Sequence, residues 1–306
     1  MMALAIGIDI GGTKMSAGVI GSRGLVDGSV ITEDTPAFTG PETIVALAVE
    51  MVNSLEGVGD ASLAVGVGSA GVIGADGSIL SATNSIRGWQ GFGLGPSMMK
   101  ELGRPVRVIN DVHAAALGEA RLGIGKSLES FLMVTVGTGV GGAIYRNGQF
   151  LAGASGTAGS LGHTAARNQL PRVCTCGQAG HIEAYASGPA IELAYADATG
   201  RKSRLKEIAA LAAGGEHLGG DVVACEVIHS AAAILGVGLA DAMNLEDLDA
   251  VVIGGGVASI GELYLEAVRA AYAAAALPGP SRAAIHRATL GPLATVAGAG
   301  LYALQE

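Results

Sequence analysis

The chain has 306 residues, of which 15% are charged and 4% aromatic, and its formal net charge at pH 7 is −9. This length suffices for about two domains, each with its own core. The acidic balance argues against a nucleic-acid surface, although a small anionic ligand needs only a few local donors. Three cysteines give no disulfide framework and fit a reducing compartment. No basic region precedes an apolar run at the N-terminus, and the most apolar window, residues 131–145, is too short to span a bilayer. We therefore expect a cytoplasmic protein that needs no membrane.

Short apolar runs separated by turn glycines open the chain and predict a β-meander. The first strand covers residues 4–8 and ends at Asp9, and further strands are expected at residues 14–20, 25–32, 63–67 and 106–109. Helical spacing of apolar residues predicts helices at residues 41–55, 97–102 and 112–121.

The second half of the chain repeats the first in outline. Residues 6–14 and 133–142 both read as strand, Gly/Thr turn and strand, which indicates two domains with the same core topology. Further strands are expected at residues 131–136, 143–145 and 250–253, and helices at residues 188–197, 202–213, 221–243, 259–275 and 292–304. We expect one domain over residues 1–112, joined by the C-terminal helix within 292–306, and a second over residues 113–291 that carries a metal-binding loop.

Four soft or borderline metal ligands lie in that loop: His163, Cys174, Cys176 and His181. Imidazole and thiolate suit Zn²⁺, and four such ligands without a vacancy describe a structural site. Two glycines, Gly177 and Gly180, would let the chain turn back sharply. The alternative is a polar loop with two inert cysteines.

A bare backbone turn follows the first strand: Asp9-Ile-Gly11-Gly12-Thr13-Lys14. Glycines let N–H groups approach phosphate oxygens, and Thr13 and Lys14 add a hydroxyl and a positive charge. Asp9 could hold Mg²⁺, which usually takes few carboxylates and keeps several waters. An ordinary hairpin turn is the alternative. The matching turn at residues 137–142, with Thr138 as a second hydroxyl donor and Gly139 beside it, favours two hairpins that clasp a polyphosphate.

Two rival phosphate motifs do not fit. The P-loop pattern is absent, and Gly-x-Gly-x-x-Gly at residues 66–71 and 137–142 lacks the helix that a dinucleotide fingerprint requires. The run Gly254-Gly255-Gly256 stands between a predicted strand and a predicted helix. It could face a nucleotide at the helix N-terminus, or it could serve close helix–sheet packing.

The pair Asn110-Asp111 ends a buried strand and opens a helix. Such a pair can be a helix N-cap. Alternatively Asp111 is a general base, because ligands bind at the carboxyl ends of strands in open α/β sheets.

Together these motifs resemble the ROK family (repressors, open reading frames and sugar kinases) of the actin-like ATPase superfamily. The matching stretches run in family order over nearly the whole chain: residues 9–14, Asn110-Asp111, residues 137–142, Gly162-His163, the Cys174–Gly180 loop with Glu183, and Gly254–Gly256. The resemblance implies an α/β fold of two RNase H-like (actin-like ATPase) domains with a cleft between them. It also implies that ATP, with Mg²⁺, phosphorylates the 6-hydroxyl of a bound sugar.

Site roles follow from the same resemblance. Asp111 is the implied base, Asn110, His163 and Glu183 hold sugar hydroxyls, and Asn84 lies in a loop that often reaches the sugar. The glycine turns, with Gly254, Gly255 and Gly256, are expected at the nucleotide. Family members are commonly dimers or tetramers. The repressor branch carries a helix-turn-helix before the first strand, so a DNA-binding role is disfavoured here, while a sugar-binding regulator without catalysis stays an alternative.

Two departures from the family pattern matter. His181 stands where the family usually has a third cysteine, which zinc also accepts. Ser160 stands where glucokinase-like members have a glutamate that contacts sugar hydroxyls. Some bacterial N-acetylmannosamine kinases lack that glutamate, and the Gly162-His163-Thr164 stretch looks like theirs. We therefore expect N-acetylmannosamine rather than glucose as the sugar, because a lost hydroxyl partner changes which sugar is favoured.

Overall fold

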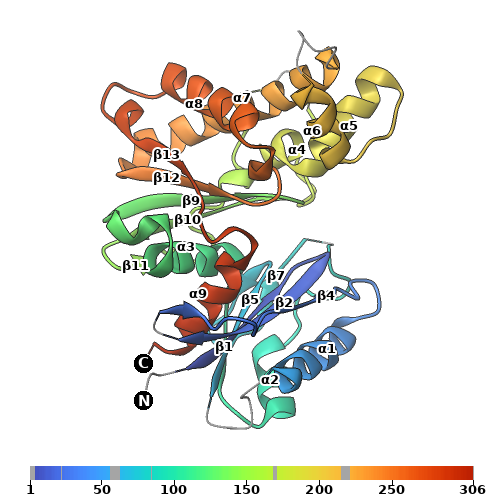
Figure 1. The fold of residues 1–306 in the computed structure, drawn as a ribbon, viewed down its shortest axis with the longest axis vertical. Helices are drawn as coiled ribbons and strands as arrows, with labels where there is room; N and C mark the ends of the chain where they lie inside the picture. Colours follow the sequence, from blue (N-terminus) through green and yellow to red (C-terminus); the bar gives the residue numbers. More distant parts are fainter. Residues whose placement is uncertain are drawn as a thin grey trace. The chain divides into compact units, whose positions relative to one another are not determined.

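The computed structural model describes residues 4–21, 23–55, 63–83, 85–167, 171–214 and 221–305. It is a mixed α/β structure built on two main sheets (Figure 1). The predicted helices, and most of the predicted strands, are present to within a few residues. The strands of the first half are β1 (Ala5–Ile10), β2 (Lys14–Gly21), β3 (Gly24–Leu25), β4 (Ile31–Asp34), β5 (Ala64–Ser69), β6 (Val72–Ile73), β7 (Ile79–Ser81) and β8 (Val106–Asn110).

The first sheet has the strand order β3-β2-β1-β5-β8, and β4 also pairs with β2. β2 runs antiparallel to β1, whereas β5 and β8 run parallel to it. The carboxyl ends of β1, β5 and β8 therefore share one edge. The single strand expected at residues 25–32 is wrong: β3 and β4 are separate, because the chain turns between them at Gly28, whose φ is 75°.

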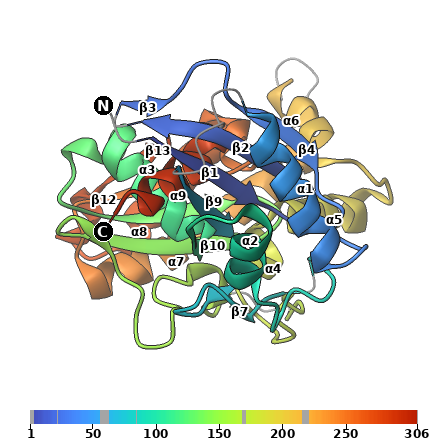
Figure 2. The same cartoon turned by 90° about the horizontal axis from the view of Figure 1, so that it is seen from below.

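Large apolar residues alternate with small or polar residues along the parallel strands, so the two faces of this sheet differ. In β1, Ile6, Ile8 and Ile10 enter the core under α1 (Pro41–Ser54) and α2 (Leu94–Leu102). The residues between them are small or polar and face the other way, because successive side chains of a strand point to opposite faces. There α9 (Ala294–Ala303) covers the sheet and α3 (Asp111–Leu122) packs on α9 (Figures 1 and 2).

Glycine allows α9 to lie directly on the sheet and on α3. A Cβ added to Gly7 or Gly66 would lie 1.9 or 1.8 Å from a carbonyl oxygen of α9. At the crossing with α3, a Cβ on Gly298 would lie 1.7 Å from the carbonyl oxygen of Ala114. The backbones are therefore in contact, and no other residue fits these positions without a shift.

The second sheet has the order β11-β10-β9-β12-β13, in which β12 runs parallel to both β9 and β13. Its strands are β9 (Ser130–Val136), β10 (Val140–Arg146), β11 (Gln149–Phe150), β12 (Ala250–Gly254) and β13 (Ala284–Arg287). A hairpin turn at Asn147-Gly148 joins β10 to β11, with φ values of 53° and 84°. The sequence interpretation missed β13, a short edge strand. The remaining helices are α4 (Glu183–Ala186), α5 (Gly188–Thr199), α6 (Leu205–Ala213), α7 (Val222–Glu246) and α8 (Glu262–Ala275).

α7 is, among the described residues, the one helix long and apolar enough to cross a membrane by length and composition. Half of its apolar stretch is buried, and α8 packs along it. Its buried residues include Ile228, Leu235, Leu239 and Met243. This is the environment of a core helix.

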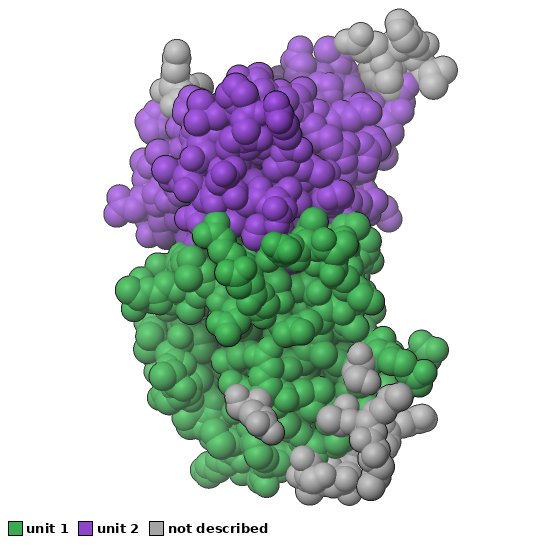
Figure 3. Space-filling model, turned by 90° about the vertical axis from the view of Figure 1, so that its left-hand side faces the viewer, with its two compact units in different colours: residues 1–129, 143–158, 289–306 green, residues 130–142, 159–288 purple. Residues whose placement is uncertain are grey.

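Contacts divide the chain into two compact units (Figure 3). The first unit comprises Met1–Glu129, Ala143–Ala158 and Thr289–Glu306, and the second comprises Ser130–Gly142 and Gly159–Ala288. This division differs from the predicted limits at residues 112 and 291. α3 belongs with the first unit because it packs along α9.

The α3–α9 crossing gives a stability prediction. The Gly298→Ala variant should unfold more easily by about 2 kcal/mol or more, because overpacking outweighs the better helix propensity of alanine. Gly279→Ala is the matched control, since a Cβ there meets nothing within 4 Å. Thermal and urea unfolding measure both. Equal stability of the two variants would contradict the close approach of the helices.

Candidate active site and metal centre

Two carboxylates of the first unit interact at the shared strand edge. Asp9 lies near the end of β1, on the glycine face, and Asp111 is the first residue of α3 after β8. Burial, followed by the negative charge of Asp111, raises the pKa of Asp9 to about 8. Burial also raises the pKa of Asp111, although the Val112 amide, 3.0 Å from its Oδ1, opposes the shift. A raised pKa in a pair of facing carboxylates is typical of a functional site.

Asn110 is the N-cap of α3. Its Oδ1 accepts hydrogen bonds from the amides of Val112 and His113 at 2.9 and 3.1 Å. Its Nδ2 donates to the carbonyl oxygen of Gly71 at 3.1 Å. The capping interpretation is therefore confirmed, and it fixes the start of the helix that carries Asp111.

The predicted glycine turn after β1 is present. The Gly11 amide donates to the Lys14 carbonyl at 3.0 Å, and Thr35 Oγ1 donates to the Gly11 carbonyl at 2.7 Å. Thr13 and Lys14 are exposed, and within the described residues neither side chain has a hydrogen-bond or ion-pair partner. They are free to meet a ligand. Asn84, expected near the sugar, lies outside the described residues.

The second unit has a glycine site of its own at the end of β9. The Gly137 amide donates to the Gly139 carbonyl, and the Gly188 amide donates to the Gly137 carbonyl, both at 2.8 Å. The α5 N-terminus thus lies beside this turn. Thr138 is exposed and has no hydrogen-bond partner among the described residues.

The run of three glycines after β12 packs on the end of β9. Gly255 has φ 91°, and a Cβ there would lie 2.4 Å from the Val136 carbonyl oxygen. Gly255 therefore allows the loop to approach β9 closely, which is a contact of a loop with a strand and not the helix–sheet packing that the sequence offered as an alternative. The predicted helix at residue 259 begins only at Glu262, after a 3₁₀ turn over Ala258–Ile260. Gly256 thus does not open a helix, although a Cβ there meets nothing within 4 Å.

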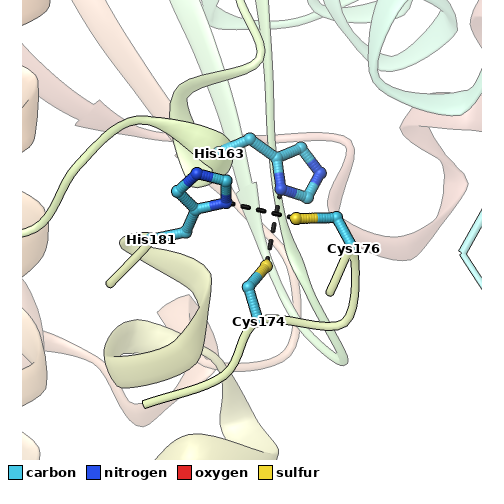
Figure 4. A group of neighbouring side chains, drawn as sticks. All are labelled: His163, Cys174, Cys176 and His181. Carbon is cyan, nitrogen blue, oxygen red and sulfur yellow. Dashed lines mark hydrogen bonds between the residues drawn. The ribbon is translucent and has the colours of Figure 1, made fainter. Parts of the chain in front are cut away.

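The four predicted metal ligands come together in the second unit (Figure 4). The ligand atoms of His163, Cys174, Cys176 and His181 all lie within 4.8 Å of one another. His163 Nδ1 is 3.5 Å from Cys174 Sγ, and His181 Nδ1 is 3.2 Å from Cys176 Sγ. With Zn–S near 2.3 Å and Zn–N near 2.1 Å, a tetrahedral site places sulfur and nitrogen about 3.6 Å apart. The donor set therefore fits one tetrahedral metal ion.

Backbone hydrogen bonds shape the loop around this cluster. Cys174 exchanges bonds with Gln178 and Gly177 across a tight turn, at 2.8 and 2.9 Å. An isolated antiparallel β-bridge pairs Ala165 with His181. It brings His181 close to His163, which lies two residues before Ala165. The other ring nitrogen of His163 points away from the cluster (Figure 4), so it is available to a hydroxyl.

Glu183, the first residue of α4, is buried and bonded within the second unit. Its Oε2 accepts from the Val140 amide at 3.0 Å, and its Oε1 accepts from Thr175 Oγ1 and contacts Cys174 Sγ at 3.3 Å. This carboxylate thus joins the turn after β9 to the metal loop. The sequence interpretation missed Thr175, which stands between the two cysteines and gave no separate signal.

Ser160 and His163 share one turn. The 3₁₀ turn Leu161–His163 follows Ser160 directly, and the His163 amide donates to the Ser160 carbonyl at 3.1 Å. The residue on which the predicted sugar preference rests is therefore held by the same turn as a metal ligand.

The parallel strands with half-buried carboxylates at one edge, and the second sheet with its own glycine turn, define an α/β protein of the actin-like ATPase fold. The fold matches the crystal structure of a ROK family glucokinase from Streptomyces griseus in complex with glucose and AMPPNP. The TM-score is 0.87 at 33% identity, over 99% of this chain and 100% of that one.

Residues 5–306 match the sequence model of the ROK family, and the chain belongs to that family. A glucokinase of Streptomyces coelicolor is 35% identical over 285 residues, which cover 89% of this chain and 87% of that protein. An N-acetylmannosamine kinase of Escherichia fergusonii is 35% identical over 271 residues, which cover 86% of each.

The raised pKa of Asp9 predicts a pH-dependent stability. An aspartate in the unfolded chain ionises near pH 4, whereas folded Asp9 keeps its proton to about pH 8. The contribution of Asp9 to the free energy of unfolding is therefore greatest below pH 4 and decreases as the pH rises toward 8. The Asp9→Asn variant lacks this loss, so at pH 8 it should be more stable than the wild type by on the order of 5 kcal/mol.

Thermal unfolding of both proteins in buffer without divalent cations, from pH 4 to pH 8, measures the effect. The difference between them should be smallest at pH 4. Parallel stability curves over the whole range would show that Asp9 ionises normally in the folded protein.

Proposed function

We propose that this protein is an ATP-dependent kinase that phosphorylates the 6-hydroxyl of a hexose or an N-acylhexosamine. The observation that carries the proposal is the pair of half-buried carboxylates, Asp9 and Asp111, at the carboxyl ends of parallel strands. Phosphoryl transfer depends mainly on positioning and charge neutralisation, and needs a group to accept the proton of the hydroxyl.

Asp111 is the proposed general base. It stands on a capped helix start, so its position is fixed by Asn110. Its raised pKa makes it a better proton acceptor than an ordinary aspartate near neutral pH. Once the carboxylate has taken the proton of the sugar hydroxyl, the oxygen can form a bond to the terminal phosphorus of ATP, while the bond from that phosphorus to the bridging oxygen breaks and ADP leaves.

Asp9 is the proposed holder of Mg²⁺, directly or through water. A hard divalent cation suits carboxylate oxygens, and its charge would relieve the repulsion that raises the pKa of Asp9. When bound, Mg²⁺ neutralises charge on the phosphate oxygens.

The phosphates of ATP are proposed to meet backbone amides and free side chains of the glycine turns. In the first unit these are Gly11 and Gly12 with the exposed Thr13 and Lys14. In the second unit the proposed contacts of the nucleotide are Thr138, Gly139, Gly254, Gly255 and Gly256. Gly255 and Gly256 are both exposed, whereas Gly254 is buried.

The sugar is proposed to meet Asn84, Asn110, Ser160, His163 and Glu183. Among these, the free ring nitrogen of His163 supports the role best (Figure 4). Glu183 already accepts hydrogen bonds at both oxygens, so each oxygen has only its remaining lone pair for a sugar hydroxyl.

N-acetylmannosamine is the proposed sugar. Ser160 supports this choice, because it stands at the position where glucokinase-like members have a glutamate. Glucose is the second candidate, favoured by the equal identity to a glucokinase and by the structural likeness to the glucose complex. We also propose a homodimer or homotetramer in the cytoplasm. The candidate metal centre is proposed to hold one structural Zn²⁺, which would keep the Ser160–His163 turn rigid.

The Asp111→Asn variant should release ADP about 10²–10⁴-fold more slowly than the wild type, because its amide accepts no proton. Its sugar affinity, measured by calorimetry, should stay within about threefold. Asp76→Asn, in an exposed turn, is the control and should turn over normally. Normal turnover by Asp111→Asn would remove the proposed base.

The Ser160→Glu variant should shift preference toward glucose. The ratio of kcat/KM for glucose to that for N-acetylmannosamine should rise about tenfold or more, because the new carboxylate gives a sugar hydroxyl a hydrogen-bond partner. Ser155→Glu, in an exposed loop, should leave the ratio unchanged. An unaltered ratio in Ser160→Glu would show that another residue sets the preference.

Elemental analysis of the purified protein should find about one zinc per chain. Cys176→Ser should lose most of that zinc, because it removes one of four ligands. Cys225→Ser should keep it, since Cys225 lies on α7 outside the cluster. A metal-free wild type with full turnover would contradict the structural zinc.

A further inference from the structure

The first unit contains a second pocket, of about 610 Å³, beside the C-terminal half of α3. Small-molecule sites commonly have about 300–1,000 Å³. The walls come from α3, the β10–β11 hairpin and the end of the chain after α9. The lining includes Leu117, Arg121, Gln149, Phe150, Tyr302 and Gln305.

The pocket is positively charged. Arg121 is exposed and, over the described residues, has no ion pair or hydrogen bond. Among the described residues that line the pocket, none carries a carboxylate. A second guanidinium, that of Arg107, lies over the Tyr302 ring at 4.3 Å from its centroid and donates to the carbonyl of Gln305. The pocket therefore suits an anion, and Arg121 is the group that would bind it.

Two aromatic walls stand at an angle to each other. The ring centroids of Phe150 and Tyr302 are 6.1 Å apart, with 63° between the ring planes. A flat ring can stack on one wall and meet the edge of the other. The amides of Gln149 and Gln305 offer both donors and acceptors, which ring nitrogens and exocyclic groups require.

We propose that this pocket is an effector site for a heteroaromatic ring that carries a phosphate, as in a nucleoside monophosphate, and that the bound ligand acts on Asp111 through α3. The charge of Arg121 selects the phosphate, and the Phe150–Tyr302 corner selects the ring. This site is separate from the glycine turns assigned to the substrate nucleotide.

The connection to Asp111 is short. α3 begins at Asp111 and carries both Leu117 and Arg121. The buried ring of His113 stacks on Phe150, with centroids 4.8 Å apart and 20° between the planes. A ligand that fixes Phe150 therefore fixes His113, which lies in the same helical turn as Asp111.

AMP is the probe. Calorimetry is run with saturating Mg·AMPPNP, so that the proposed substrate-nucleotide site is filled. The wild type should still bind one AMP per chain, and Arg121→Glu should weaken this binding at least tenfold. Lys126→Glu makes the same charge change on an exposed residue outside the lining and should alter it less than twofold.

Coupling is read in two ways. With saturating ATP and sugar, AMP should change kcat of the wild type at least twofold and leave that of Arg121→Glu unchanged, while both proteins have equal kcat without AMP. The NMR signals of the His113 ring should shift on addition of AMP, a readout that stands even if no sugar is phosphorylated.

Three results would overturn the proposal. They are the absence of AMP binding beyond the AMPPNP site, equal AMP affinity of Arg121→Glu and wild type, or AMP binding that changes neither kcat nor the His113 signals. Binding of a hexose 6-phosphate at Arg121 in place of AMP would likewise contradict the proposal that the ligand carries a heteroaromatic ring.

Discussion

The difference between the two faces of the first sheet determines where the candidate active site forms. Large aliphatic residues of β1 and β5 face α1 and α2, while Gly7 and Gly66 face α9. Because these glycines let the α9 backbone touch the sheet, α3 can cross α9 close to the strand ends. Asp9 belongs to the same row as Gly7, so it lies on the face that α9 covers, and there the charge of Asp111, at the start of α3, reaches it. A change in this packing would separate the two carboxylates.

The carboxylate pair is unfavourable for the folded protein without ligands. Burial raises the pKa of both groups, and the charge of Asp111 raises the pKa of Asp9 further. A site that binds a divalent cation and accepts a proton needs such an arrangement. Favourable interactions elsewhere in the protein must offset its cost to the stability of the fold. The second unit differs: there both carboxylate oxygens of Glu183 accept hydrogen bonds, and Glu183 ties the candidate metal loop to the glycine turn. One unit thus carries two carboxyl groups with raised pKa values, and the other carries a hydrogen-bonded loop with a Cys/His cluster.

The sequence predicted features that depend on local pattern. Strand and helix periodicity located most elements, and the spacing of His163, Cys174, Cys176 and His181 predicted a cluster of side chains that lie together in the structure. Features that depend on contacts between distant segments were missed or wrong. The bonds of Glu183 to Val140 and Thr175 leave no trace in spacing, and a short strand such as β13 has too few residues for a pattern. The alternation of glycine with Ile or Val in β1 and β5 is visible in the sequence, but the sequence does not show that α9 packs on these glycines.

The titration of Asp9 and Asp111, followed by the carboxyl carbon signals in NMR, tests the account most directly. Without Mg²⁺, Asp9 should titrate near pH 8 and Asp111 above its ordinary range, with each assigned through the corresponding asparagine variant. Addition of Mg²⁺ should lower the apparent pKa of Asp9, because a bound cation favours the carboxylate. Two carboxyls that titrate near pH 4, with no response to Mg²⁺, would contradict the proposal that this strand edge is the catalytic site.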